Sequence, residues 1–398
     1  MSALMNTYAR LPVSFTHGDG ATLFDASGRD YLDAVSGIAV TNLGHAHPRV
    51  TEAVSSQVAR LTHCSNLFHV ERQEQAGAAL TELSGMDRVF FCNSGAEANE
   101  AAIKLARLRG HQLGMTAPQI VVLEGAFHGR TLGALTASGN KKIQEGFGPL
   151  APGFLRAPAN DLNALRQLAS ETPDIAAVML EPVQGESGIR PLALDYLAGV
   201  AALCKERDWL LMFDEVQSGN GRTGSYFYYQ QIGLAPDVVA TAKALGNGVP
   251  IGACLARGAA AEIFAPGHHG STYGGNPIAC AAALAVMQTL REDDLMERAK
   301  PLQTLIRDSF LGALGHREKV IEFRSAGLMI GIELADSCGE LAAQALHKGL
   351  LIYVTAGSTI RLLPPLDMSD AQAARLGSEL AGVVDKFYEG QAMAARSA

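Results

Sequence analysis

Between residues 88 and 255, short apolar runs alternate with segments of helical periodicity, and this alternation is the strongest constraint on the fold. Runs that are apolar on both faces, with helices between them, are typical of a parallel sheet that helices cover on both sides. The sequence therefore predicts an α/β fold with a mostly parallel central sheet. In such sheets ligands bind beyond the carboxyl ends of the strands. The runs are 88–92, 119–125, 175–182, 209–215 and 237–242.

The remainder of the chain follows a different pattern. A long helical segment at 277–292 is followed by short strand-like runs that interleave with helices. Ser369 and Gln372 have the spacing of a capping box, which predicts the start of a last helix. We therefore expect a large domain, 57–275, a smaller α+β domain, 276–398, and a turn-rich N-terminal segment, 1–56, that packs with the smaller domain.

Composition excludes several classes of protein. A chain of 398 residues with 48% hydrophobic content can bury a large core, and 40 acidic against 32 basic residues without a charge run argue against a nucleic-acid partner. The six cysteines lack ligand spacing, as expected for reduced core residues of a cytoplasmic protein. The adjacent His268 and His269 have no further ligands nearby, so we predict no metal site. We recognise no export signal and no segment that would span a membrane.

Three polar features follow apolar runs. Lys243 lies between the run 237–242 and a glycine-rich turn, where burial would lower its pKa and leave the amine nucleophilic; the alternative is a lysine that extends to solvent. Asp214 ends the preceding run, and its alternative is a structural ion pair. Ser94 and Gly95 begin a helix whose backbone N–H groups suit a phosphate, or they form an ordinary helix cap.

Together these features match the needs of pyridoxal 5'-phosphate. That cofactor requires a lysine for its aldehyde, a carboxylate for its ring nitrogen and a cradle for its phosphate. Neighbouring strands would deliver Asp214 and Lys243 to one crevice beside the phosphate cradle. The glycine motifs of nucleotide-binding loops are absent from the sequence.

Motifs that extend over the whole chain carry a resemblance to a known family. They are "GDGATLFDASGRDYLDAVSGIAVTNLGHAHP", "FCNSGAEANEAAIKLAR", "AFHGRT", "EPVQGESG", "FDEVQSGNGRTG", "AKALGNGVPIGA", "STYGGNP" and "IRLLPPL". The chain resembles the class III aminotransferases, which act on ornithine, acetylornithine and ω-amino acids and have fold type I of the pyridoxal phosphate enzymes. The segment from Asp214 to Lys243 is the most specific part of this resemblance.

The resemblance implies a role for each residue around the cofactor ring. Lys243 would bind the cofactor as an imine and carry the proton between substrate and cofactor, and Asp214 would hold the ring nitrogen. Val216 and Phe127 would contact the two faces of the ring, although core packing is the alternative for Phe127. Gln217 would reach the phenolic oxygen of the ring.

The resemblance also implies the phosphate site and the active unit. Ser94, Gly95 and Ala96 would bind the phosphate, while Thr272 would reach the phosphate bound by a neighbouring subunit. The expected active unit is therefore a homodimer with shared active sites. We assign no role to His128, because a lone histidine beside a glycine is typical of a turn.

Substrate residues follow from the same resemblance. Arg361 corresponds to the arginine that binds an α-carboxylate, and Arg130 corresponds to a second arginine; surface or interdomain ion pairs are the alternatives. Glu186 corresponds to a glutamate that pairs with Arg361 when no α-carboxylate is present. One pocket could then accept a terminal amine and afterwards an α-keto acid.

The implied reaction transfers the terminal amine of N2-acetylornithine to 2-oxoglutarate, as in arginine biosynthesis. Succinylornithine, acyl-diaminopimelate, ornithine and 4-aminobutyrate are alternative donors, since enzymes for these substrates share nearly every motif above. An aminomutase or decarboxylase of the same fold and a non-catalytic binding protein are alternatives of a different class.

Overall fold

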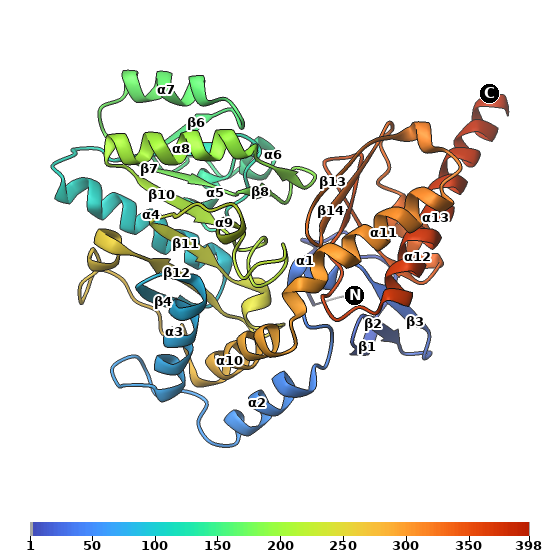
Figure 1. Ribbon diagram of the computed structural model, residues 1–398, viewed down its shortest axis with the longest axis horizontal. Coiled ribbons are helices and arrows are strands. Elements are labelled where there is room, and N and C mark those ends of the chain that lie inside the picture. Colours follow the sequence, from blue (N-terminus) through green and yellow to red (C-terminus); the bar gives the residue numbers. More distant parts are fainter. Residues whose placement is uncertain (1–2, 398) are drawn as a thin grey trace.

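The computed structural model describes residues 3–397 and contains two lobes joined by a long helical connection (Figure 1). The larger lobe is built on a seven-stranded sheet. Its strands, in spatial order, are β4 (Arg88–Cys92), β12 (Gly252–Ala256), β11 (Val238–Thr241), β10 (Leu210–Asp214), β7 (Ile175–Leu180), β5 (Gln119–Leu123) and β6 (Phe154–Ala157). Among these strands, β12 alone runs opposite to the other six, so the prediction of a mostly parallel sheet is confirmed.

Side chains alternate between the two faces of this sheet, as the period of a strand requires. In β10, Leu210 and Met212 belong to the core cluster that contains α4, whereas Leu211 and Phe213 belong to the cluster that contains α8. The helices of this lobe are α2 (Pro48–Val58), α3 (Glu71–Ser84), α4 (Gly95–Gln112), α5 (Leu132–Ala137), α6 (Lys141–Gln144), α7 (Leu162–Glu171), α8 (Leu194–Arg207), α9 (Tyr228–Gln231) and α10 (Pro277–Glu292).

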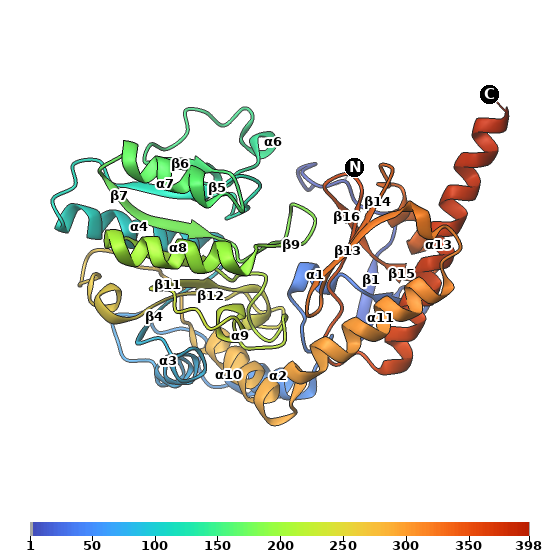
Figure 2. The same ribbon diagram turned by 45° about the horizontal axis from the view of Figure 1, so that its top comes forward.

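The smaller lobe has an antiparallel sheet of four strands in the order β13-β14-β17-β16. Its long last helix projects away from the larger lobe (Figure 2). The predicted capping box is confirmed, because Gln372 N donates to Ser369 Oγ at 3.2 Å and Ser369 N donates to Gln372 Oε1 at 2.9 Å. The elements are β13 (Val320–Ala326), β14 (Met329–Leu334), β16 (Tyr353–Thr355), β17 (Thr359–Leu362), α11 (Ala299–Ala313), α12 (Leu341–His347) and α13 (Asp370–Ser397).

The first strands of the chain lie beside the smaller lobe. Leu32 of β3 pairs with Leu350 of β15 in a parallel bridge, which completes a four-stranded sheet. The remaining short elements include β1 (Phe15–Asp19), β2 (Thr22–Asp25), β3 (Asp30–Asp33), β15 (Leu350–Leu351), β8 (Val183–Gln184), β9 (Arg190–Pro191), α1 (Ser36–Ala39) and the 3-10 turn η1 (Lys243–Leu245).

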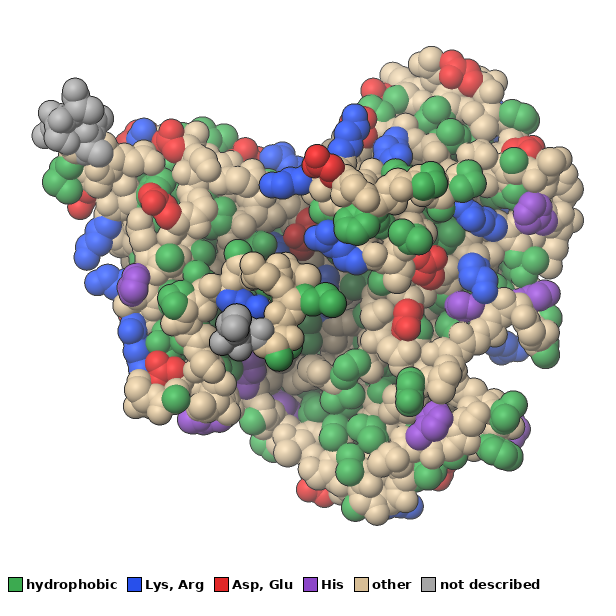
Figure 3. All heavy atoms as spheres, turned by 180° about the vertical axis from the view of Figure 1, so that it is seen from behind, with side chains coloured by type: hydrophobic (Ala, Val, Ile, Leu, Met, Phe, Trp, Pro, Cys, Tyr) green, Lys and Arg blue, Asp and Glu red, His purple; other side chains and the backbone are tan. Residues whose placement is uncertain are grey.

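The surface between the two lobes is hollowed when the molecule is seen from behind (Figure 3). Acidic and basic side chains lie close together at the upper edge of this hollow. No helix among the described residues is long and apolar enough to cross a lipid bilayer.

Candidate active site

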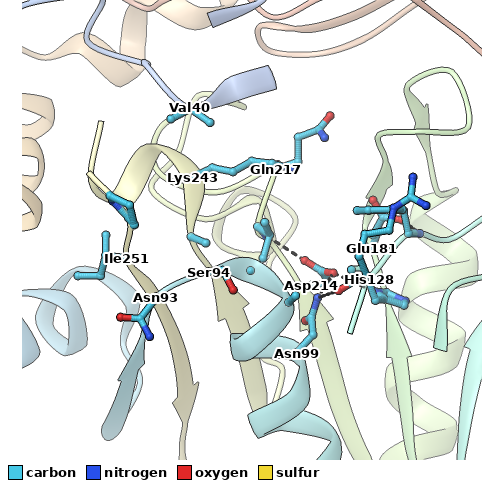
Figure 4. A pocket seen from close by; sticks show the side chains of 18 of the residues that line it. Val40, Asn93, Ser94, Asn99, His128, Glu181, Asp214, Gln217, Lys243 and Ile251 are labelled. Atoms are coloured by element: carbon cyan, nitrogen blue, oxygen red, sulfur yellow. Dashed lines mark hydrogen bonds and ion pairs between the residues drawn. The ribbon is translucent and has the colours of Figure 1, made fainter. Parts of the chain in front are cut away.

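A cavity of about 390 Å³ opens at the carboxyl ends of β4, β10 and β11, where a sheet of this kind is expected to bind its ligand (Figure 4). Most of the residues that we expected to contact the cofactor or the substrate lie in its wall. They are Ser94, Gly95, Ala96, Phe127, Arg130, Asp214, Val216, Gln217 and Lys243.

Lys243 lies in the turn immediately after β11, and its backbone adopts the left-handed conformation with φ at +49°. The preceding residues are fixed by Asn220, whose Nδ2 donates to Thr241 Oγ1 at 2.9 Å and to Ala242 O at 3.0 Å. Burial lowers the pKa of Lys243, and the charges of Glu186 and Asp214 oppose this shift. Such an amine has the electrostatic setting of a nucleophile.

Asp214 lies at the end of β10 on the face that α4 covers. Its Oδ2 accepts hydrogen bonds from Asn99 Nδ2 at 2.7 Å and from His128 Nδ1 at 2.8 Å, and its Oδ1 accepts from Val216 N at 3.0 Å. The parallel pairing of β10 with β11 brings this carboxylate and Lys243 into one cavity, as the sequence predicted. Two neighbouring strands therefore carry the amine and the acid.

His128 and Asn99 were missed by the sequence analysis. Both are buried, and both contact Asp214 directly. Burial disfavours the charged His128 ring, but the hydrogen bond and charge of Asp214 and the charge of Glu181 outweigh burial, so the pKa of His128 is raised. The signals were the position of His128 one residue after Phe127 and the position of Asn99 one helical turn after the start of α4.

Glu181 is a further buried acid at the end of β7, and it also escaped prediction. Its Oε1 accepts from Phe127 N at 2.8 Å, and its Oε2 accepts from Gly185 N at 3.1 Å. Burial, followed by the charge of Asp214, raises the pKa of Glu181 to about 7. Glu181 therefore fixes the loop that carries Phe127 and adds a titratable group to the cavity wall.

The amino end of α4 forms another wall of the cavity. Ser94 caps this helix, since Glu97 N donates to Ser94 Oγ at 3.2 Å. The N–H groups of Gly95 and Ala96 lie in the first turn, where no intrahelical acceptor exists for them. A side chain at Gly95 would meet Val216 at 2.6 Å, so glycine is required for the close approach of this helix to the segment after β10.

These residues fit pyridoxal phosphate. Buried polar atoms in the cavity wall lack a partner among the described residues, namely Asn99 Oδ1, His128 Nε2 and Gln217 Oε1. Val216 and Phe127 supply apolar surface for an aromatic ring, and the amino end of α4 suits a dianionic phosphate. When bound at this position, the cofactor would supply an electron sink for a substrate carbanion.

The expected substrate residues occupy two positions. Arg130 is exposed in the cavity wall, with Cζ 5.8 Å from the centre of the Phe127 ring. Arg361 is buried in the smaller lobe, and its Nη1 forms an ion pair with Glu186 Oε1 at 2.6 Å. Glu186 and Arg361 do not line the cavity, but their charges shift the pKa of Lys243 in opposite directions. Both groups are therefore close to the amine.

Thr272 lies outside the cavity of its own chain. It is exposed and lines a second hollow, next to Ser271, whose Oγ accepts from Asn93 Nδ2 at 3.3 Å. Within the part of the chain that the structure describes, no group of three or more His, Cys, Asp or Glu side chains is arranged to hold a metal ion.

Comparison with known proteins agrees with this geometry. The model of the aminotransferase class-III family matches residues 4–384. The acetylornithine aminotransferase of Nitrosomonas europaea is 49% identical over 389 residues, which cover 98% of this chain and 99% of that protein. The N-acetylornithine aminotransferase structure from Stenotrophomonas maltophilia superposes with a TM-score of 0.84 at 34% identity, over 96% of this chain and 98% of that chain.

A further solved structure bears on the cofactor. The ornithine aminotransferase of Toxoplasma gondii, described with pyridoxal phosphate at its active site, superposes with a TM-score of 0.93 at 32% identity, over 98% of this chain and 93% of that chain. The family match over nearly the whole chain decides the assignment. The chain belongs to the class III aminotransferases, which have fold type I and depend on pyridoxal phosphate.

Proposed function

We propose that this enzyme transfers the terminal amine of N2-acetylornithine to 2-oxoglutarate and forms N-acetylglutamate 5-semialdehyde and glutamate, a step of arginine biosynthesis. The observation that carries the proposal is the similarity of this chain, over nearly its whole length, to relatives named acetylornithine aminotransferase. The cavity supports it, because Lys243 and Asp214 lie together in its wall.

Each residue around the cavity has a proposed task. Lys243 would move a proton between the reacting carbon of the substrate and the cofactor, for which its lowered pKa suits the amine. Asp214 would hold the ring nitrogen in its charged form. Val216 and Phe127 would fix the plane of the ring, and Gln217 would contact the phenolic oxygen.

The Arg361–Glu186 ion pair supports the use of two different substrates. While a terminal amine reacts, the carboxylate of the donor is remote from the reacting atom, and Glu186 would neutralise Arg361. 2-Oxoglutarate carries a carboxylate beside its reacting carbon, and Arg361 would bind that group. Arg130, which is exposed at the cavity, is the proposed partner of a second carboxylate.

A homodimer is the proposed active unit, in which Ser94, Gly95 and Ala96 of one subunit and Thr272 of the other would bind one phosphate. Exposed apolar side chains close to Thr272 support it, since Leu67 is 86% and Tyr273 is 64% exposed in the single chain. Large apolar groups that surround a hollow are typical of a protein interface.

We also propose that the chain divides at residues 56 and 275 and that the enzyme works in the cytoplasm. Strands β1, β2 and β3 of the segment 1–56 would pack on the smaller domain, while the helices at the two boundaries, α2 and α10, pack together against the larger lobe. The pairing of β3 with β15 supports the first part. The scattered cysteines, none of which is in a disulfide, support the second.

The function is tested by mixing the holo-protein with one amino donor at a time, without acceptor, and following the loss of the visible absorbance of the lysine-bound cofactor. Fast loss with N2-acetylornithine and slow loss with ornithine or 4-aminobutyrate are expected. Faster loss with another donor would replace the proposed substrate. A product formed without any keto acid would instead indicate an aminomutase, and no loss with any donor would count against transamination.

A further inference from the structure

Tyr353 and Arg361 form a directly opposed pair on the two strands of the β16–β17 hairpin. Their Cα atoms are register partners in the antiparallel pairing, so their side chains leave the same face of the sheet. The Arg361 Cζ lies 4.9 Å from the centre of the Tyr353 ring, within the range of a cation–π contact. The contact is therefore a consequence of the strand register.

The same hairpin face docks on the loop that carries Glu186. Thr355 Oγ1 donates to Glu186 O at 2.5 Å, and Arg361 Nη1 contacts Gly185 O at 3.4 Å in addition to the Glu186 carboxylate. One nitrogen of the guanidinium is thus held by the larger lobe, and the central carbon of the group lies over the Tyr353 ring. These contacts fix the orientation of the arginine.

The opposite edge of this guanidinium is free. Nε and Nη2 of Arg361 are buried and have no hydrogen-bond partner among the described residues. These two nitrogens can donate two parallel hydrogen bonds to one carboxylate. A buried donor without a partner is unfavourable, so the pair is arranged for a ligand that supplies acceptors.

We propose that Tyr353 is a positioning residue for substrate carboxylates: its ring holds the Arg361 guanidinium in place, both while it pairs with Glu186 and when it receives a carboxylate that lies next to the reacting carbon. Tyr353 itself is 43% exposed, and none of the described residues forms a hydrogen bond with its hydroxyl. Its contribution therefore comes from the ring. This inference rests on the proposed role of Arg361 in the aminotransferase reaction.

The test compares Tyr353→Leu with the matched control Tyr353→Phe in the holo-enzyme. In single-turnover reactions with L-glutamate, whose carboxylate adjoins the reacting amine, Tyr353→Leu should raise the half-saturating concentration about 3- to 10-fold and leave the limiting rate nearly unchanged. Tyr353→Phe should behave like the wild type. With N2-acetylornithine, which reacts at its far end, neither substitution should change the half-saturating concentration.

Two results would overturn the proposal. The first is an equal rise of the half-saturating glutamate concentration in Tyr353→Phe and Tyr353→Leu, which would assign the effect to the hydroxyl. The second is a rise in Tyr353→Leu that is equal for glutamate and for N2-acetylornithine, which would indicate general damage to the site. If the wild type reacts with glutamate but not with N2-acetylornithine, the proposed donor is wrong, and 4-aminobutyrate replaces it as control. If no donor reacts, binding of unreactive glutarate to the three proteins, measured by calorimetry, decides the role of Tyr353.

Discussion

Asp214 and Glu215 are neighbours in the sequence and both are buried, but they lie on opposite faces of the central sheet. Asp214 continues the face of Leu210 and Met212 toward α4, and its Oδ2 accepts from the side chains of Asn99 and His128. Glu215 lies on the other side. Its carboxylate accepts from Tyr228 N at 2.7 Å, from Tyr229 N at 2.9 Å and from Ser218 Oγ at 2.9 Å.

The two carboxylates differ in the kind of hydrogen-bond partner that they have. A histidine ring that can carry a positive charge touches Asp214, whereas Glu215 has only neutral donors and burial raises its pKa to about 7. A carboxylate with a charged neighbour keeps its negative charge for a ligand, and one with backbone donors organises a loop. Burial alone therefore does not separate an acid that can serve a bound ligand from one that organises a loop.

The largest expected effect is that of Asp214→Asn on the reaction. The amide cannot hold a positive charge on the cofactor ring, so the single-turnover rate should fall by about 10²- to 10³-fold. The free energy of unfolding of the cofactor-free protein should change far less, by about 1 kcal/mol. Stopped-flow absorbance and urea unfolding measure the two quantities.

His128→Gln is the matched control for that substitution. Glutamine can still donate to Asp214 but carries no charge, so the rate should fall by only about 10-fold, and His128→Leu should cause a larger loss. If Gln and Leu had equal effects, the hydrogen bond to Asp214 would not matter.

Glu215→Ala should instead reduce stability. The substitution leaves the donors of Tyr228, Tyr229 and Ser218 without their acceptor, which should lower the free energy of unfolding by about 2–4 kcal/mol. The cofactor absorbance of the folded fraction should stay unchanged. A variant of normal stability that has lost the cofactor would reverse the roles that we assign to the two acids.

The smallest expected effect is on the pH dependence of stability. Because the pKa of Glu215 is raised from the ordinary 4.5 to about 7, the folded state binds more protons than the unfolded state between these values. The contribution of protonated Glu215 to the free energy of unfolding is therefore fully present below about pH 4.5 and is lost as the pH rises through about 7. Over this pH range, the free energy of unfolding of the wild type should fall by about 1–3 kcal/mol relative to that of Glu215→Gln.

Urea unfolding at several pH values measures that difference. The same measurement on Glu181→Gln is needed as well, because the pKa of Glu181 is also raised to about 7 and Glu181 can add its own pH dependence to that of the wild type. A difference between wild type and Glu215→Gln that is constant with pH would show that Glu215 remains charged in the folded protein.

The sequence predicted those parts of the fold that depend on strong local patterns. The five apolar runs became β4, β5, β7, β10 and β11, and the cap at Ser369 starts α13. β6 and β12 were not predicted. Phe154–Ala157 is short and interrupted by Arg156, and Gly252–Ala256 is rich in small residues, so neither has a strand pattern that exceeds its surroundings.

The candidate site was predictable where a residue follows a strand, as Asp214 and Lys243 do. It was not predictable where partners come from distant segments. Asn99, His128 and Glu181 reach Asp214 or its surroundings from α4, from the loop after β5 and from the end of β7. Their spacing in the chain carries no periodic signal, and only the order of strands in the sheet brings them together.

The backbone of Lys243 has a consequence for protein engineering. A non-glycine residue in the left-handed conformation costs about 1–2 kcal/mol, and only glycine or asparagine adopts it readily. Lys243→Gly or Lys243→Asn should therefore relieve strain at this turn, so a redesign guided by thermal stability alone would select against the amine that we propose to bind the cofactor. The lysine side chain serves activity, whereas the backbone conformation at residue 243 favours other residues for stability. Consensus or stabilising libraries should therefore leave residue 243 unchanged.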